Sequence, residues 1–205
     1  MKVLSFKNKK VIVFDLDGTI IDLAVDWNRL KNMLSKRYSK IYGNICNFES
    51  ITACLNYIVE KKDENELKNI FKIIEEQELK NLWKSEIIQE TVFFINNKEL
   101  FGVEKNAKFA ILSLNTKNVI IKSLKLAMVA DKFDYLVGRE DVRNWKPNPE
   151  GLLKIKDHYR LKNEEMVYFG DLEKDVLTGK NAGIDAYLIE DLINLINKKR
   201  EERNI

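Results

Sequence analysis

Short apolar runs alternate with longer stretches of helical periodicity along most of the chain. The clearest run is Val11-Ile12-Val13-Phe14, which is unbroken and mostly β-branched and leads into an acidic segment. A run of this kind predicts a strand buried on both faces, as in parallel sheets. Similar runs recur at 109–112, 135–137, 166–169 and 186–189, with helical stretches between them, for example 117–127 and 149–158. Strands alternating with helices predict an α/β domain with a central parallel sheet.

The region 22–93 has a different pattern, because no convincing strand interrupts its helical periodicity. Asp26 and Asp63 each precede such a stretch and are suitable helix N-caps. Asp63 followed by Glu66 resembles a capping box. Since one crossover normally needs one helix, we expect an all-helical cap domain over residues 22–93. The alternative is a set of ordinary crossover helices. The α/β core domain would then comprise residues 1–21 and 94–205.

The composition limits the kinds of partner that the protein is expected to bind. The 205 residues carry 35 basic and 32 acidic side chains, a net charge of +3, and no basic stripe of the kind that nucleic-acid binders use. We expect no nucleic-acid partner. A signal peptide or membrane span is not evident in the pattern, and Cys46 and Cys54 match no zinc motif. We therefore expect a cytoplasmic protein without a membrane partner, and the sequence does not reveal its oligomeric state.

The first candidate for chemistry is the segment Asp15-Leu16-Asp17-Gly18-Thr19, which follows the first apolar run. Two carboxylates that are only two residues apart repel each other, and at the end of a buried strand both lose hydration. A compensating cation is therefore needed. Gly18 permits a tight turn after the strand. Ligands of parallel α/β sheets bind at the carboxyl ends of strands, where this segment lies. The plain alternative is a solvated Asp-Gly turn.

A second acidic segment follows the run 166–169, with Asp171 directly after Gly170 and Asp175 at helical spacing. Alone, these acids could simply stabilise a helix N-terminus. Together with Asp15 and Asp17, they would make an oxygen-rich site at one end of the sheet. Carboxylates, carbonyls and water are the ligands that Mg²⁺ prefers. The four acids therefore predict a magnesium site.

An acidic site needs cationic or hydrogen-bonding groups before it can bind a phosphate. Ser113 closes the run 109–112 and could donate a hydrogen bond to a phosphate oxygen, although a lone serine there is more often an N-cap. Lys146 precedes Pro147-Asn148-Pro149 and could neutralise both the phosphate and the acids, although an isolated lysine is usually solvated. Trp145 is a candidate to fix this loop. Arg139 could contact substrate, although we expect it to be a surface arginine.

These motifs, in this order, resemble the four motifs of the haloacid dehalogenase-like (HAD) hydrolase superfamily, and the layout is most similar to the phosphoglycolate phosphatase type with a helical cap. The resemblance covers nearly the whole chain outside the cap. It implies a Rossmann-like three-layer core, with the nucleophile on the central strand and the cap inserted after the first motif. That expectation agrees with the helical block at 22–93.

The resemblance also implies residue roles and a reaction. Asp15 would attack phosphorus and form an aspartyl-phosphate, while Asp17 acts as general acid and then general base. Mg²⁺ would be held by Asp15, Asp17 through its backbone carbonyl, and Asp171, with Asp175 supporting the metal site or orienting Lys146. Ser113 and Lys146 would bind the phosphoryl group.

We therefore expect a Mg²⁺-dependent phosphatase, a phosphoric monoester hydrolase whose substrate is a small phosphorylated metabolite. Dehalogenases generally lack the second acid of the first motif, so Asp17 argues against that activity. Two alternatives stay open at this point, a phosphomutase of the same superfamily and a non-catalytic phosphate-binding or regulatory module.

Overall fold

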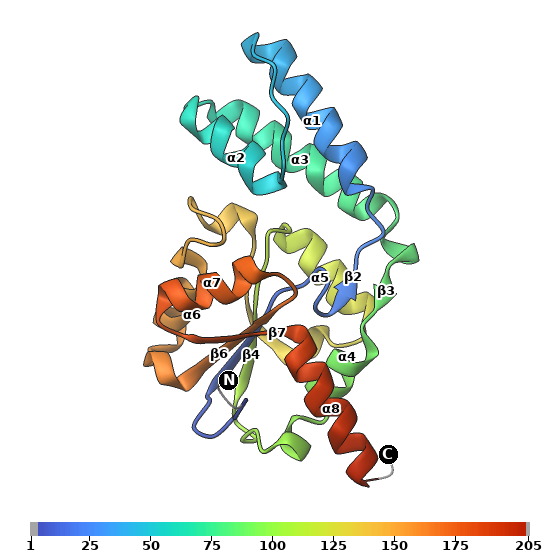
Figure 1. Cartoon of the computed structure of the whole chain (residues 1–205), viewed down its shortest axis with the longest axis vertical. Coiled ribbons are helices and arrows are strands. Elements are labelled where there is room, and N and C mark those ends of the chain that lie inside the picture. Colours follow the sequence, from blue (N-terminus) through green and yellow to red (C-terminus); the bar gives the residue numbers. More distant parts are fainter. Residues whose placement is uncertain (1–3, 204–205) are drawn as a thin grey trace. The chain divides into compact units, whose positions relative to one another are not determined.

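The computed structural model describes residues 4–203, which form two compact units. The larger unit comprises residues up to Leu23 and from Ser85 onward, and the smaller comprises Ala24–Lys84. The larger unit is α/β, and the smaller is built from helices (Figure 1). No helix in the described part of the chain is long and apolar enough to cross a membrane.

A parallel sheet of five strands forms the centre of the larger unit, in the order β5-β4-β1-β6-β7. Its strands are β1 (Val11–Phe14), β4 (Lys108–Leu112), β5 (Phe133–Val137), β6 (Met166–Gly170) and β7 (Asp185–Leu188). All of β1 is buried, as its apolar run predicts. Phe14 pairs with Ile111 on one side and Phe169 on the other, so the carboxyl ends of three strands are level.

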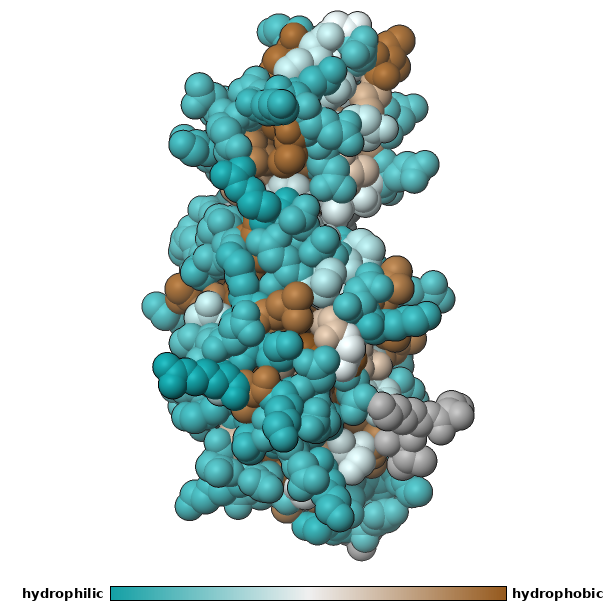
Figure 2. Space-filling view, turned by 90° about the vertical axis from the view of Figure 1, so that its left-hand side faces the viewer, coloured by the Kyte–Doolittle hydropathy of each residue, from teal (hydrophilic) through white to brown (hydrophobic). Residues whose placement is uncertain are grey.

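Helices flank this sheet, which confirms the predicted α/β class (Figure 1). They are α4 (Gln89–Asn96), α5 (Lys117–Leu126), α6 (Glu150–Tyr159), α7 (Glu173–Ala182) and α8 (Ile189–Arg203). Short 3₁₀ turns lie between the elements at η2 (Lys98–Phe101), η3 (Ala130–Lys132), η4 (Arg139–Asp141) and η5 (Asn163–Glu165). Aromatic rings fill the core, where Phe14 stacks on Phe169 at 5.7 Å between ring centroids. On the face in Figure 2, hydrophilic residues predominate and apolar residues lie in small separate groups.

The smaller unit contains α1 (Trp27–Tyr42), α2 (Ile51–Glu60), α3 (Glu64–Lys80) and the 3₁₀ turn η1 (Leu82–Lys84). Asp26 and Asp63 are N-caps, as predicted, and their side chains accept hydrogen bonds from the backbone of Arg29 and Glu66. The Glu66 carboxylate, however, accepts from Nε and Nη2 of Arg37, at 2.5 and 2.7 Å. The reciprocal half of the predicted capping box is therefore replaced by an ion pair between helices.

The helical unit ends earlier than the predicted cap boundary at residue 93. Residues 85–93 belong to the larger unit, where β3 (Glu86–Ile87) pairs antiparallel with β2 (Ile21–Asp22). The α4 helix that follows buries Phe94 in the aromatic core, with its ring 6.2 Å from that of Phe14. Periodicity alone shows that a segment is helical and amphipathic, but not which core receives its apolar face.

Candidate active site

The predicted acidic segments lie next to each other because β1 and β6 are neighbours in the sheet. Asp15 directly follows β1, and its backbone N–H bonds to the carbonyl of Phe169 in β6 at 2.8 Å. Gly18 adopts a φ of +71°, and a Cβ there would lie only 2.6 Å from Oδ2 of Asp171. The turn after β1 therefore packs directly against the loop after β6, and only glycine allows this approach.

Lys146 lies at the centre of the acidic residues. Its side chain is buried, and Nζ lies 2.6 Å from Asp15 Oδ2 and 2.6 Å from Asp175 Oδ1. Nζ also donates to the hydroxyl of Tyr168 at 3.1 Å. Burial acts to lower the pKa of Lys146, but the charges of Asp15 and Asp175 outweigh it and raise that pKa above its ordinary value. Lys146 is therefore a cation held within the site and is not exposed to solvent, as an isolated lysine in a loop usually is.

The pKa values of the two carboxylates on either side of Lys146 are shifted in opposite directions. Burial raises the pKa of Asp15 more than the charge of Lys146 lowers it. For Asp175, burial is outweighed by the charge and hydrogen bond of Lys146 and by the Tyr168 hydroxyl, so its pKa is lowered. Asp175 also accepts from the backbone N–H of Leu172 at 3.1 Å, before α7 begins. Asp175 thus stabilises a helix N-terminus and positions Lys146.

Carboxylate oxygens of Asp15, Asp171 and Asp175 all lie within 4.8 Å of one another. Both oxygens of Asp175 accept hydrogen bonds, from Lys146, Tyr168 and Leu172, and both oxygens of Asp15 accept as well, from Leu16 and Lys146. Burial, followed by the charge of Asp15, raises the pKa of Asp171 to about 6. Excess negative charge on hard oxygen donors fits a divalent cation such as Mg²⁺.

Asp17 lies outside that group of three carboxylates. Its Oδ1 accepts a hydrogen bond from the backbone N–H of Leu23 at 2.8 Å, which fixes the side chain in the turn after β1. Burial is the main cause that raises the pKa of Asp17 to about 7, and the charges of Asp15 and Asp171 add to the shift. A carboxyl group with such a pKa can both donate and accept a proton near neutral pH.

Ser113 follows β4 at the same end of the sheet and is buried. Its hydroxyl donates to Oδ1 of Asn115 at 2.7 Å, and the backbone N–H of Asn115 donates back to Oγ at 3.3 Å. These bonds define a tight loop after β4. The structure therefore places Ser113 in a turn of its own and not at a helix N-cap, which is supplied by Thr116 at the start of α5.

Sequence reasoning missed three residues around this site. The sequence pattern indicates only an apolar strand at Tyr168 and no role for Asn115, and it favours a surface position for Arg139. In the structure Arg139 is 1% exposed, so that expectation is wrong. The available signal for Tyr168 was a polar tip within an otherwise apolar buried run. Arg139 carried no such signal, because its burial depends on loops that are distant in sequence.

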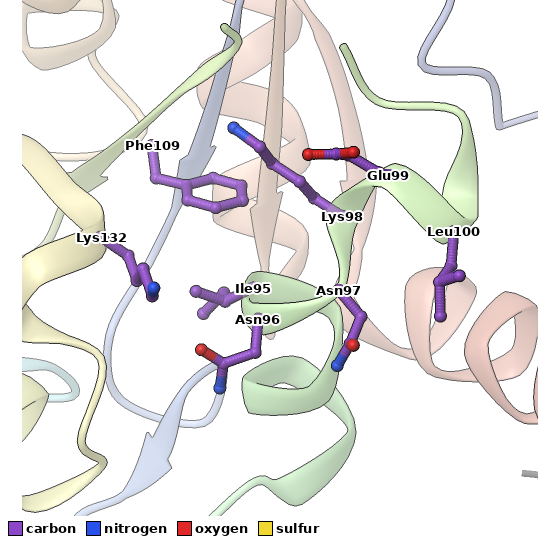
Figure 3. A pocket seen from close by; sticks show the side chains of 8 residues that line it. All are labelled: Ile95, Asn96, Asn97, Lys98, Glu99, Leu100, Phe109 and Lys132. Carbon is purple, nitrogen blue, oxygen red and sulfur yellow. The ribbon is translucent and has the colours of Figure 1, made fainter. Parts of the chain in front are cut away.

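A separate pocket of about 460 Å³ lies toward the amino ends of the strands (Figure 3). Phe109 near the start of β4 and Lys132 just before β5 line it, together with residues 95–100. Lys98 donates to the carbonyl of Ala107 there, and Lys132 pairs with Asp131 at 3.5 Å. None of the predicted site residues lines this pocket.

The fold and the site together place this protein among α/β proteins that gather acidic side chains at the carboxyl ends of a parallel sheet. The chain belongs to the haloacid dehalogenase-like hydrolase family, whose model matches residues 12–189. This confirms the resemblance inferred from the four motifs.

Individual relatives agree with this assignment. The chain is 28% identical over 183 residues to the pyrophosphatase PpaX of Halalkalibacterium halodurans, covering 87% of this chain and 82% of that protein. The structure of CbbY from Rhodobacter sphaeroides, solved in complex with phosphate, superposes with a TM-score of 0.61 at 13% identity, covering 88% of this chain and 85% of CbbY. A predicted phosphoglycolate phosphatase from Haemophilus somnus superposes with a TM-score of 0.59 at 14% identity, covering 88% and 84%. At these identities the two solved structures support the fold alone.

Proposed function

We propose that this protein is a Mg²⁺-dependent phosphatase that hydrolyses a small phosphorylated metabolite through an aspartyl-phosphate at Asp15. The observation that carries the proposal is the buried Lys146 ammonium, held between Asp15 and Asp175 beside Asp171. A site with this charge distribution combines a carboxylate nucleophile, ligands for a hard cation and a fixed positive charge. Phosphoryl transfer needs these three components and little else.

The metal would be held by the side chains of Asp15 and Asp171 and by the backbone carbonyl of Asp17. Asp175 would support the site by keeping Lys146 in place. When bound, Mg²⁺ supplies positive charge that polarises the phosphoryl group and lowers repulsion between phosphate and carboxylates.

In the first step, a carboxylate oxygen of Asp15 forms a bond to phosphorus while the bond from phosphorus to the leaving oxygen breaks. Asp17 donates its proton to that leaving oxygen. In the second step, Asp17 takes a proton from a water molecule whose oxygen forms a bond to phosphorus. The bond from phosphorus to Asp15 breaks, which yields orthophosphate and frees the Asp15 carboxylate. Ser113 and Lys146 would bind phosphoryl oxygens in both steps. The pKa of about 7 for Asp17 suits both of its roles.

The substrate has two candidate classes. The sequence motifs favour a phosphoric monoester of a small metabolite. The 28% identity to a protein named pyrophosphatase PpaX makes inorganic pyrophosphate the second candidate. The chemistry at Asp15 is the same in both cases, since either substrate presents a terminal phosphoryl group and a leaving oxygen.

Phosphate release from p-nitrophenyl phosphate, phosphorylated metabolites and pyrophosphate tests the proposal. We expect release with Mg²⁺, none with EDTA, and none from Asp15→Asn, whose fold should be intact by circular dichroism. Full activity of Asp15→Asn would overturn the nucleophile assignment. Conversion of a phosphosugar to its isomer without net phosphate release would favour the phosphomutase, and no turnover of any substrate would favour the binding module.

A further inference from the structure

Arg139 is the largest fully buried side chain among the described residues. It begins η4, just after β5 and Gly138. Removing a guanidinium group from water is costly unless hydrogen bonds compensate for the lost hydration. Arginine at this position therefore requires a structural or functional reason, which its contacts provide.

On one side, Arg139 holds the loop that follows β4. Its Nε donates to the carbonyl of Leu114, and its backbone N–H donates to the carbonyl of Asn115 at 3.0 Å. These two residues directly follow Ser113 and shape its turn. Gly138 permits the close packing, because a Cβ there would lie 2.9 Å from the Asn115 carbonyl oxygen. Arg139 thus fixes the backbone that orients the Ser113 hydroxyl.

On the other side, Arg139 is linked to the loop that carries Lys146. The indole N–H of Trp145 donates to the carbonyl of Arg139 at 2.9 Å, and Trp145 is itself 5% exposed. Trp145 is the residue immediately before Lys146, whose Nζ reaches Asp15 and Asp175. A continuous chain of hydrogen bonds therefore joins the Ser113 loop, Arg139, Trp145 and the Lys146 loop.

We propose that Arg139 and Trp145 are positioning residues that set the separation of Ser113 and Lys146, the two groups assigned to the phosphoryl oxygens. The inference rests on the proposed function, because it assumes that both groups bind one phosphoryl group. Ser113 has one O–H, which donates to Asn115 and would turn to the phosphoryl oxygen when substrate binds. Two donors on separate loops can bind one phosphoryl group only if the loops are fixed relative to each other. A misplacement of about 1 Å at such a site costs on the order of 100-fold in rate.

Two substitutions at residue 139 separate the hydrogen bond from the packing. Arg139→Met keeps a side chain that ends at the level of Nε and has no donor. Arg139→Gln places an amide N–H at the same number of bonds from Cα as Nε, so it can still donate to Leu114. We expect kcat/KM to fall on the order of 10-fold or more in Arg139→Met and by less in Arg139→Gln. Trp145→Phe, which removes the indole N–H, should also lower kcat/KM.

Lys9 provides the matched control for loss of a buried cation. It is 5% exposed, lies before β1 at the amino end of the sheet, and donates to the carbonyls of Glu164 and Met166 at 2.8 Å each. Lys9→Met should lower the thermal unfolding midpoint and leave kcat/KM unchanged when assayed well below that midpoint. Inhibition by orthophosphate should weaken in Arg139→Met and not in Lys9→Met.

The outcomes distinguish the inference from the function on which it rests. An active wild type in which Arg139→Met and Arg139→Gln lose activity equally, or no more than Lys9→Met, overturns the positioning role alone. An inactive wild type that also fails to bind orthophosphate in calorimetry with Mg²⁺ overturns both. Retained activity in Arg139→Gln, with loss of activity in Arg139→Met and Trp145→Phe, supports the positioning role of Arg139 and Trp145.

Discussion

At the scale of single residues, Lys146 is the positive charge that compensates the buried carboxylates of the site. It is the partner of two carboxylates, Asp15 and Asp175, which are 6% and 0% exposed. Removing one partner of a buried ion pair destabilises a protein by more than the intact pair stabilises it, because a buried charge is left without a counter-charge.

Lys146→Met should therefore destabilise the protein by about 3–5 kcal/mol, because the two buried carboxylates lose their counter-charge. Urea unfolding followed by circular dichroism measures this difference. Lys154→Met serves as the control, since Lys154 is exposed and its ion pair with Glu150 spans 3.9 Å. Equal stabilities of the two variants would contradict the charge balance described for Lys146.

Tyr168 supports the same lysine through its hydroxyl. It accepts from Lys146 at 3.1 Å and donates to Asp175 Oδ1 at 2.9 Å. Tyr168→Phe keeps the ring and removes both bonds, so we expect kcat/KM to fall on the order of 10-fold, as for the loss of a hydrogen bond to a charged group. Tyr135→Phe, whose ring stacks on His158 instead, should retain full activity. A Tyr168→Phe enzyme with unchanged kcat/KM would show that Asp15 and Asp175 hold Lys146 without it.

At the scale of elements, the decisive contact is between the turn after β1 and the loop after β6. Asp171 fills the space beside Gly18, and the Gly18 backbone has a positive φ. A side chain at this position meets both a conformational and a steric obstacle.

Gly18→Ala should displace Asp171 and lower both activity and affinity for Mg²⁺, because the added Cβ would lie 2.6 Å from a carboxylate oxygen. Titration of phosphate release against Mg²⁺ concentration measures the effect. Gly102 is the matched control, with a φ of +78° and no atom within 4 Å of the position that a Cβ would take. Gly102→Ala should cost stability alone. Wild-type Mg²⁺ dependence in Gly18→Ala would show that Asp171 does not take part in metal binding.

Some structural features can be predicted from the sequence and others cannot. The strands were predictable because a strand buried on both faces needs an unbroken apolar run, as at Val11–Phe14. Caps such as Asp26 were predictable because they act within a few residues. The end of the helical unit and the burial of Arg139 were not, since both depend on contacts with distant segments. The acidic site was predictable because parallel strands place their carboxyl ends together.

At the scale of the whole molecule, the raised pKa values in the acidic site make the stability of the protein depend on pH. Asp17 and Asp171 have pKa values raised to about 7 and about 6, mainly by burial. The folded protein therefore binds more protons at these groups than the unfolded chain does up to about pH 7. Wherever the folded state binds more protons, stability falls as pH rises.

We accordingly expect these two groups to lower the thermal midpoint of the metal-free protein as pH rises from about 5 to about 7.5. Saturating Mg²⁺ should raise the midpoint, and by more at the higher pH, because the ligands must be ionised to bind. Differential scanning calorimetry in EDTA and in Mg²⁺ provides both values. Asp171→Asn should show a weaker pH dependence and a smaller Mg²⁺ effect. A Mg²⁺ shift equal to wild type in Asp171→Asn would argue against the assigned ligand set.

The proposed mechanism depends above all on a covalent phosphoryl intermediate at Asp15. Mass spectrometry of acid-quenched Asp17→Asn protein, after mixing with p-nitrophenyl phosphate and Mg²⁺, detects such an intermediate. The nitrophenolate leaving group needs no proton, so formation should proceed while hydrolysis, which requires Asp17 as base, slows. We predict one added phosphoryl group on the peptide that contains Asp15, and none when Asp15 is also replaced by Asn. Phosphate release without modification of this peptide, or a phosphoryl group on another residue, would contradict the mechanism.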